Sequence, residues 1–254
     1  MRKELKMKNT GKIILWGIGI VITVLVLVSV GFLLKFKSET KNMNPVETGK
    51  TVDNIFSIKD SFVNMFLIRD SAHYIAIDAG NSMDNITAEF KKLDINPGQV
   101  IAVFLTHTDK DHVAAIKLFK NARVYISRQE EQMINGERSK FLFFGNHLDV
   151  KNHLFIEDGE TLMLGNTRIK GILTPGHTSG SMCYLANNKY LFTGDLLSLK
   201  EGKVAEFNKF FNMDSKEAKE SIRKITNLPG VQYIFTAHYG YTADYQFAVK
   251  SWRN

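Results

Sequence analysis

Cysteine is almost absent from this sequence: Cys183 is the only one, which excludes an internal disulfide and a zinc site built from thiolates. Cys183 lies within residues 181–185, an apolar run that predicts a strand. We therefore expect a buried, inert thiol rather than a catalytic nucleophile.

Excess charge is absent from most of the chain, although the net charge is +7. Residues 1–50 contain nine Lys or Arg and three Asp or Glu, a balance of +6, so residues 51–254 carry only +1. The basic character belongs to the N-terminal segment, and we do not expect the rest of the chain to bind nucleic acid. The hydrophobic and charged shares, 44% and 23%, are those of a folded protein with one sizeable core or two domains at most.

Charged residues are missing altogether from Ile13 to Leu34. A helix of this length is about 33 Å long at about 1.5 Å per residue, which is enough to cross a membrane. The run continues into Leu33-Leu34-Lys35-Phe36-Lys37, which is a poor cleavage site, so we predict a retained signal anchor rather than a cleaved signal peptide.

This anchor divides the chain into a basic segment (residues 1–12), a transmembrane helix (13–34), a linker (35–51) and a folded domain (52–254). Five basic residues before the anchor favour a cytoplasmic N-terminus: Arg2, Lys3, Lys6, Lys8 and Lys12. We predict a single-pass protein of the cell membrane with its domain outside the cytoplasm. The opposite orientation stays open, because lysines also follow the anchor.

Residues 52–254 alternate between short apolar runs and amphipathic stretches, which predicts an α/β domain. The predicted strands are residues 55–58, 62–68, 74–78, 100–105, 124–127, 153–156, 161–164, 167–173, 181–185, 190–193 and 233–237. The predicted helices are residues 84–93, 113–119, 128–134, 214–226, with Asp214 or Ser215 as cap, and 243–250.

Four residues able to bind metal are packed into one short stretch: His107, Asp109, Asp111 and His112. The apolar run 100–105 directly before them predicts a strand buried on both faces. His107 and Asp109 point to the same side of an extended chain, while the other two fall on the first turn of the next helix. Converging imidazole and carboxylate groups suit zinc, iron or manganese, and the alternative is a solvated polar turn.

Three later strand ends carry the same residue types. His177 lies in a glycine-rich loop between two predicted strands, which favours a rigidly held ligand. Asp195 follows the strand 190–193, and His238 follows the strand 233–237. Together with the first cluster, these side chains are enough to hold two metal ions, and their recurrence favours the metal site over the polar turn.

The remaining histidines, His73, His147 and His153, lack such positions and are expected to be ordinary surface or core residues. Asp78 ends the predicted strand 74–78 before a glycine turn. It is either a carboxylate that orients a metal ligand or a cap or turn residue.

Two aromatic groups are candidate walls of a substrate cleft, and ordinary packing is the alternative for both. The first is the segment 136–145 with Phe141, Leu142, Phe143 and Phe144, which could form a flap. The second consists of Tyr239 and Tyr241.

The order and spacing of the metal-binding candidates resemble the metallo-β-lactamase fold family. Its usual motif is His-x-His-x-Asp-His after a buried strand, then a Pro-Gly-His-Thr loop, a Gly-Asp strand end and a late histidine. This chain has His107-x-Asp109-x-Asp111-His112, Pro175-Gly176-His177-Thr178, Gly194-Asp195 and His238. The resemblance covers residues 52–254 and implies a four-layer αββα sandwich with a dinuclear centre along one sheet edge, preceded here by one transmembrane helix.

The resemblance also implies a role for each site residue. The first metal would be held by His107, Asp109 and His177, and the second by Asp111, His112 and His238. Asp195 would bridge both metals, as in the hydroxyacylglutathione hydrolase and phosphodiesterase branches. Many zinc β-lactamases have a cysteine at that position, which argues against antibiotic hydrolysis. Asp111 would also orient the bridging hydroxide, which makes it the predicted catalytic residue.

Asp109 departs from the family pattern, because most relatives have histidine at that position. Three aspartates and a bridging hydroxide would neutralise two divalent ions, whereas the histidine version would be more positive by one charge. A less positive centre should lower the acidity of the bridging water and shift metal preference toward iron or manganese. The flavodiiron branch is similar here, with a glutamate at the corresponding position.

We therefore predict a membrane-anchored hydrolase with two divalent ions, zinc first and iron or manganese as alternatives. A hydroxide bridging the metals would attack an ester, thioester, lactone, amide or phosphodiester of a small-molecule substrate. Two other functions stay open. One is a diiron oxidoreductase, although no flavodoxin-like second domain is expected here, and the other is a non-catalytic metal-binding surface module.

Overall fold

The computed structural model of this chain describes residues 2–140 and 145–253, and it contains two compact units, Met1–Asn42 and Met43–Asn254. The first unit consists of the helix α1 (Arg2–Thr40), which continues past Leu34 into the segment expected to be a linker. Its stretch Ile14–Thr40 is long and apolar enough to cross a membrane, and its large apolar side chains between Ile14 and Leu34 are exposed. The expected flap residues 141–144 lie outside the described residues.

Within the described part of the second unit, one sheet has the spatial order β1–β2–β3–β4–β5–β6–β7. Its strands are β1 (Gly49–Val52), β2 (Ile55–Asp60), β3 (Val63–Asp70), β4 (His73–Ile77), β5 (Val100–Phe104), β6 (Arg123–Ser127) and β7 (Leu154–Ile156). Pairing is antiparallel from β1 to β4 and parallel from β4 to β7. The parallel part is buried on both faces, which explains the unbroken apolar run in β5.

The second sheet has the spatial order β15–β14–β11–β10–β9–β8. Its strands are β8 (Thr161–Leu164), β9 (Thr167–Leu173), β10 (Met182–Ala186), β11 (Tyr190–Phe192), β14 (Tyr233–Phe235) and β15 (Tyr241–Thr242). Only β11 and β14 are parallel to each other, and the other pairs are antiparallel. A separate antiparallel hairpin consists of β12 (Leu197–Lys200) and β13 (Lys203–Glu206).

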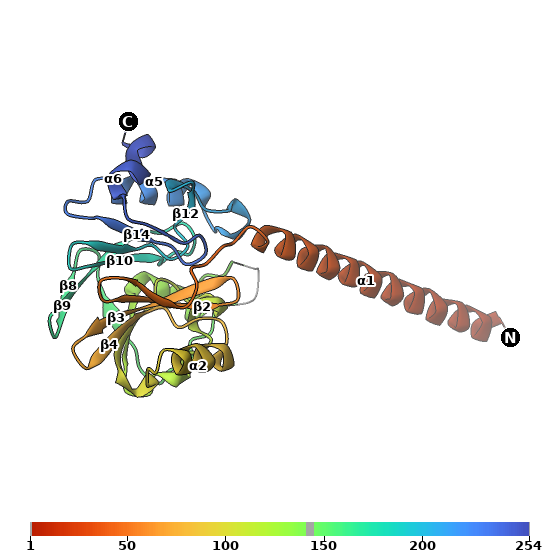
Figure 1. Ribbon diagram of the computed structural model, residues 1–254. Helices are drawn as coiled ribbons and strands as arrows, with labels where there is room; N and C mark the ends of the chain where they lie inside the picture. The colour runs from red at the N-terminus through yellow and green to blue at the C-terminus, as the bar shows by residue number, and fades with distance from the viewer. Residues whose placement is uncertain (1, 141–144, 254) are drawn as a thin grey trace. The chain divides into compact units, whose positions relative to one another are not determined.

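Helices cover the outer faces of both sheets. The helices in the described part of this unit are α2 (Met83–Lys92), α3 (Lys110–Val113), α4 (Glu131–Ile134), α5 (Ser215–Ile225) and α6 (Tyr245–Val249). The short 3-10 turns are η1 (Pro97–Gln99), η2 (Ile116–Leu118), η3 (Arg128–Glu130), η4 (Lys209–Phe211) and η5 (Lys250–Trp252). Figure 1 shows the two sheets face to face, with α2 outside the first sheet and α5 and α6 outside the second. The predicted four-layer αββα sandwich is therefore confirmed.

Aromatic side chains fill the space between the sheets. Phe66 of β3 contacts Phe192 and Phe235 of the second sheet, with ring centroids 5.5 and 5.3 Å apart. Phe104 of β5 lies 5.2 Å from the ring of Tyr184. Each fully buried ring of this kind contributes about 1.5–3 kcal/mol of hydrophobic stabilisation. This core fixes β5 against the second sheet and so brings together strand ends that are far apart in sequence.

The helix α5 illustrates how local sequence specifies these elements. Asp214 caps it, because its side chain accepts hydrogen bonds from the backbone N–H groups of Lys216 (2.8 Å) and Glu217 (3.0 Å). Ala218, Ile222 and Ile225 follow at helical spacing and are buried, and the two isoleucines pack with apolar residues of the second sheet. The predicted helix and one of its two predicted caps are therefore confirmed.

Several local predictions were incomplete. β1, the β12–β13 hairpin and β15 were not predicted, because each of these strands has four residues or fewer, and so short a run carries little periodic signal. The predicted helix 113–119 is split in the structure into α3, which begins at Lys110, and η2. Asp111 and His112 lie on α3, as predicted for the first turn of this helix.

Candidate metal centre

The seven residues singled out from the sequence all lie at one edge of the sandwich. His107 and Asp109 follow β5, and Asp111 and His112 lie on α3. His177 lies in the loop between β9 and β10, and Asp195 and His238 follow β11 and β14. Because β11 and β14 are parallel, their carboxyl ends meet at the same edge, which explains how two residues 43 positions apart come into contact.

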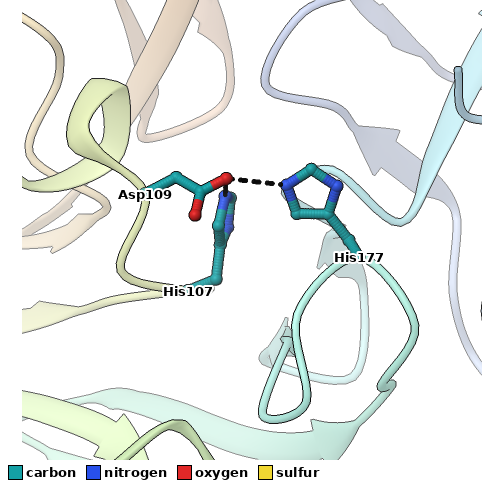
Figure 2. A group of neighbouring side chains, drawn as sticks. All are labelled: His107, Asp109 and His177. Atoms are coloured by element: carbon teal, nitrogen blue, oxygen red, sulfur yellow. Dashed lines mark hydrogen bonds and ion pairs between the residues drawn. The ribbon is translucent and has the colours of Figure 1, made fainter. Parts of the chain in front are cut away.

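His107, Asp109 and His177 form what we call the first ligand set. Their nearest nitrogen and oxygen atoms lie within 4.8 Å of one another. The carboxylate of Asp109 lies between the two rings, with Oδ2 3.6 Å from His107 Nε2 and 3.2 Å from His177 Nε2 (Figure 2). Asp109 caps no backbone N–H of α3, so its side chain is turned toward the site rather than toward the helix.

Asp111, His112 and His238 form the second ligand set, also within 4.8 Å. The Oδ2 atom of Asp111 lies 3.7 Å from His112 Nε2 and 3.6 Å from His238 Nε2. Asp195 lies between the two sets. Its Oδ1 atom is 3.4 Å from His112 Nε2 and its Oδ2 atom is 3.4 Å from His177 Nε2. This is the position that a carboxylate shared by two metal ions would have.

Each of the four site histidines is oriented by an oxygen atom at Nδ1. The partners are Thr106 Oγ1 for His107 (3.0 Å), Asp78 Oδ2 for His112 (2.9 Å), Asn212 Oδ1 for His177 (3.2 Å) and Phe62 O for His238 (2.7 Å). When Nδ1–H donates to such an oxygen, Nε2 is left with its lone pair. When the four rings are neutral, all four Nε2 atoms therefore present lone pairs to the centre, an arrangement typical of metal-binding imidazoles.

Asp78, at the end of β4, contacts two residues of the site through its carboxylate. Its Oδ1 atom accepts from the Thr106 backbone N–H at 2.7 Å, and its Oδ2 atom accepts from His112 Nδ1. Its φ of +63° also makes it a turn residue with left-handed backbone. It therefore orients the ring of His112 and also forms the turn.

Unsatisfied buried atoms at the centre show that these residues fit a metal ion. Among the described residues, His107 Nε2, His112 Nε2 and Asp195 Oδ1 are buried and have no hydrogen-bond partner. A buried polar atom without a partner costs about 1–3 kcal/mol, and a coordinated cation would remove that cost. Imidazole nitrogens and carboxylate oxygens without sulfur suit zinc, iron or manganese.

The charges of the centre interact strongly. Burial and, to a smaller extent, the neighbouring His112 lower the pKa of His107 to about 3. Burial also lowers the pKa of His112, but Asp195, Asp78 and Asp111 together raise it well above its ordinary value. Protons therefore compete with metal for the second ligand set, because a histidine must be neutral to coordinate.

Glu130, a buried carboxylate that joins the two ligand-bearing loops, was not predicted from the sequence. Its Oε1 atom accepts from the backbone N–H and the hydroxyl of Thr108, both at 2.7 Å. Its Oε2 atom accepts from the hydroxyl of Thr178 at 2.6 Å. Thr108 stands between His107 and Asp109, and Thr178 follows His177. The threonines beside the ligands were the only signal that a buried acceptor lies nearby.

Two further polar side chains contact Asp109. Asn146 Nδ2 donates to Asp109 Oδ1 at 2.9 Å and to Thr108 Oγ1 at 3.0 Å. The ammonium group of Lys140 donates to Asp109 Oδ2 and lies 2.7 Å from His177 Nε2. Neither residue belongs to a recognisable motif, so sequence reasoning could not find them.

Aromatic side chains also pack against two of the site histidines. The ring of Phe207 lies 5.2 Å from His177 and 5.9 Å from His238, and Phe62 stacks on His238 at 5.8 Å. Tyr239 and Tyr241, which were candidate cleft walls, line a groove together with residues 44–47, 199, 201 and 202. The histidines His73 and His147 are exposed, and His153 pairs with Glu131 away from the centre, as expected.

A comparison with family models supports the resemblance found in the sequence. A model described as the metallo-beta-lactamase superfamily matches residues 58–238, which include all seven residues of the centre.

Curated relatives of this chain are hydrolases by name. The probable polyketide biosynthesis zinc-dependent hydrolase PksB of Bacillus subtilis is 31% identical over 166 residues, 63% of this chain and 65% of the relative. BaeB of Bacillus velezensis, described in the same words, is 35% identical over 127 residues, 50% of this chain and 51% of the relative. A hydroxyacylglutathione hydrolase of Francisella tularensis subsp. novicida is 30% identical over 191 residues, 72% of this chain and 66% of the relative. The chain thus spans between half and two thirds of the length of these relatives.

Solved structures share the fold at lower identity. A B3 metallo-beta-lactamase described as having an active-site glutamic acid superimposes with a TM-score of 0.65 at 20% identity, covering 86% of this chain and 90% of its own. MEM-A1, a subclass B3 enzyme from a soil metagenome library, gives a TM-score of 0.61 at 22% identity, covering 77% and 80%.

Proposed function

Because this chain belongs to the metallo-beta-lactamase superfamily, we propose that its compact unit Met43–Asn254 is a metal-dependent hydrolase. The observation that carries the proposal is the convergence of four histidine Nε2 lone pairs and three carboxylates, with each Nδ1 held by an oxygen atom. Zinc is the first metal to test, because PksB and BaeB are described as zinc-dependent. The two ligand sets and the shared Asp195 support two ion positions.

Divalent ions held here would supply an activated water as nucleophile and would polarise the bond that is cleaved. The protein's own residues do the rest. Asp111 is only partly buried, with 22% of its side chain exposed, and no hydrogen bond from a described side chain holds its carboxylate. We assign it to orient the attacking water and to accept its proton. Phe62 packs on the ring of His238, and Phe207 packs on the ring of His177. These aromatic rings keep water away from the two histidines, which strengthens electrostatic interactions within the site.

The substrate class is a small molecule with a hydrolysable ester, thioester, lactone, amide or phosphodiester bond. The name of the Francisella relative makes an acylglutathione the first substrate to test. The aspartate at position 195 supports the hydrolase branches over antibiotic hydrolysis.

The apolar helix supports membrane anchoring, with the hydrolase unit outside the cytoplasm. The stretch Ile14–Thr40 has the required length and composition, and the basic residues before it favour an N-terminus inside the cell. Lys91→Cys would test the orientation, because Lys91 is exposed on α2 and Cys183 is buried and silent. Labelling of intact cells by a membrane-impermeant maleimide would support the proposed orientation, and labelling only after lysis would reverse it.

Metal content and turnover together test the hydrolase proposal. The full-length chain in detergent, reconstituted with zinc, should hydrolyse at least one member of a panel of acylglutathiones, esters and phosphodiesters. His112→Ala should lower bound zinc and reduce turnover by more than about 100-fold, since loss of a ligand exceeds the effect of losing its orienting partner. His73→Ala is the matched control, because His73 is exposed on β4 and belongs to neither ligand set. Zinc binding without turnover on the whole panel would instead favour a binding module.

A further inference from the structure

The first ligand set differs from the second in containing a cation of the protein itself. The ammonium group of Lys140 donates to Asp109 Oδ2 and to His177 Nε2, the latter at 2.7 Å. Its side chain is only 9% exposed, so the ammonium is held inside the centre rather than at its rim. Within the described residues, no lysine or arginine contacts the second ligand set.

The lone pair that binds Lys140 is the one that would bind metal. His177 Nδ1 faces Asn212 Oδ1 at 3.2 Å and donates to it, so Nε2 must be the acceptor. Zinc lies about 2.0–2.2 Å from a coordinating nitrogen or oxygen atom. An ammonium nitrogen 2.7 Å from Nε2, and in contact with Asp109 Oδ2 as well, occupies the same space. Lys140 and a metal ion therefore exclude each other from the first ligand set.

The charge of Asp109 makes this arrangement favourable. Asp109 is the residue at which the chain departs from the histidine of most relatives, and a neutral histidine could not neutralise a buried ammonium. The carboxylate can, and its second oxygen is held by Asn146 Nδ2 at 2.9 Å. Asp109 and Lys140 thus complement each other, as a charge-assisted pair in a largely buried site must.

We propose that Lys140 is an internal competitor for the first metal position, so that the second position fills first and the first fills only after the lysine side chain leaves. This inference rests on the proposed metal-dependent hydrolase. It adds that the number of bound ions depends on the free metal concentration, because the protein supplies its own cation when metal is scarce. Asp195, which contacts both sets, would then be shared by two ions only at high metal concentration.

Calorimetric titration of the full-length chain in detergent with zinc tests the proposal by measuring the affinity of each bound ion. Elemental analysis of the zinc-loaded protein then gives the number of ions bound. The wild type should bind a first equivalent tightly and a second about 10- to 100-fold more weakly, or about 1.4–2.8 kcal/mol at 1.4 kcal/mol per factor of ten. Lys140→Met keeps the length of the side chain and removes its charge, and it should tighten only the second equivalent. Lys110→Met is the control, because it removes an exposed charge next to Asp109 without a contact to either ligand set.

Two equivalents of similar affinity in the wild type, unchanged in Lys140→Met, would overturn the competitor while leaving the hydrolase intact. Absence of zinc binding would remove the proposed function itself, so the two failures are distinguishable. If Lys140→Met does not fold, anomalous diffraction from the wild type with one equivalent of zinc decides instead. A single peak between Asp111, His112 and His238 supports the proposal, and a peak between Asp109 and His177 refutes it.

Discussion

The carboxyl group of Glu130 offers a quantitative test, because it is buried between the loops that carry the first ligand set. Only 1% of the residue is exposed, and burial raises its pKa from an ordinary 4.5 to about 7, although Thr178 and Thr108 partly offset this by hydrogen bonding to the charged form. The folded protein therefore holds this proton more tightly than the unfolded chain does.

Because the pKa of Glu130 is raised in the folded state, this carboxyl group makes the protein more stable at low pH than at high pH. The stabilisation from this proton is fully present below about pH 4.5 and is lost as the pH rises through about 7. A shift of about 2.5 units at about 1.36 kcal/mol per unit corresponds to about 3 kcal/mol between the two limits. At neutral to alkaline pH, the charged carboxylate thus lowers the free energy of unfolding by up to this amount.

Glu130→Gln isolates this contribution, because the amide cannot ionise. The glutamine oxygen can still accept from Thr108, and its amide can donate to the hydroxyl of Thr178, so the variant should match the wild type near pH 4.5. Above about pH 7, it should be more stable by about 3 kcal/mol. The free energy of unfolding is measured by denaturant titration of both full-length proteins in detergent with excess chelator, at pH values from about 4.5 to above 7. Taking the difference between variant and wild type removes the contribution of titrating groups that both proteins share.

Glu217→Gln is the control, since Glu217 is exposed in the first turn of α5. It should show no comparable pH-dependent difference from the wild type. A flat difference between Glu130→Gln and wild type, or one that falls with pH, would refute the reasoning about this buried carboxyl group.

Three other predictions concern residues near the centre. Asp78→Asn should weaken zinc binding by about 10- to 100-fold in chelator competition. The asparagine oxygen would accept from the Thr106 N–H, so the amide NH2 would face the Nδ1–H of His112 in place of an acceptor; unchanged affinity would contradict this. Burial raises the pKa of the Cys183 thiol to about 12, so thiol reagents should modify it only after denaturation, and rapid labelling of the native chain would show that it is accessible. Tyr184→Phe removes the buried hydrogen bond to Leu105 O at 2.8 Å and should lower the free energy of unfolding by about 1–2 kcal/mol, whereas an unchanged unfolding curve would exclude the bond.

The strand-end positions could be predicted from sequence because two local signals coincide there. An apolar run such as residues 100–105 predicts a buried strand, and a charged or imidazole side chain shortly after it is expected at a sheet edge. The resemblance to the superfamily then predicted the αββα layers, and membership of that superfamily confirms the resemblance. The metal-binding roles of the seven residues stay predictions.

The supporting residues could not be predicted, because their roles arise only from the folded arrangement. Glu130 is 22 residues from Thr108 and 48 from Thr178, and nothing in its local sequence distinguishes it from a surface glutamate of an amphipathic helix. Lys140 reads as one more charged residue beside an aromatic segment. The role of Lys140 depends on its contact with Asp109, 31 positions earlier. The sequence shows that Asp109 departs from the family pattern, but it does not show that Lys140 is the residue that contacts it.

The central claim is that these histidines and carboxylates coordinate metal, and X-ray absorption at the zinc edge of the zinc-loaded, full-length chain tests it most directly. The arrangement predicts nitrogen and oxygen ligands at about 2.0–2.2 Å, with the multiple scattering of at least two imidazole rings and no sulfur. A spectrum of hydrated zinc without imidazole, or one with a sulfur ligand, would contradict the account.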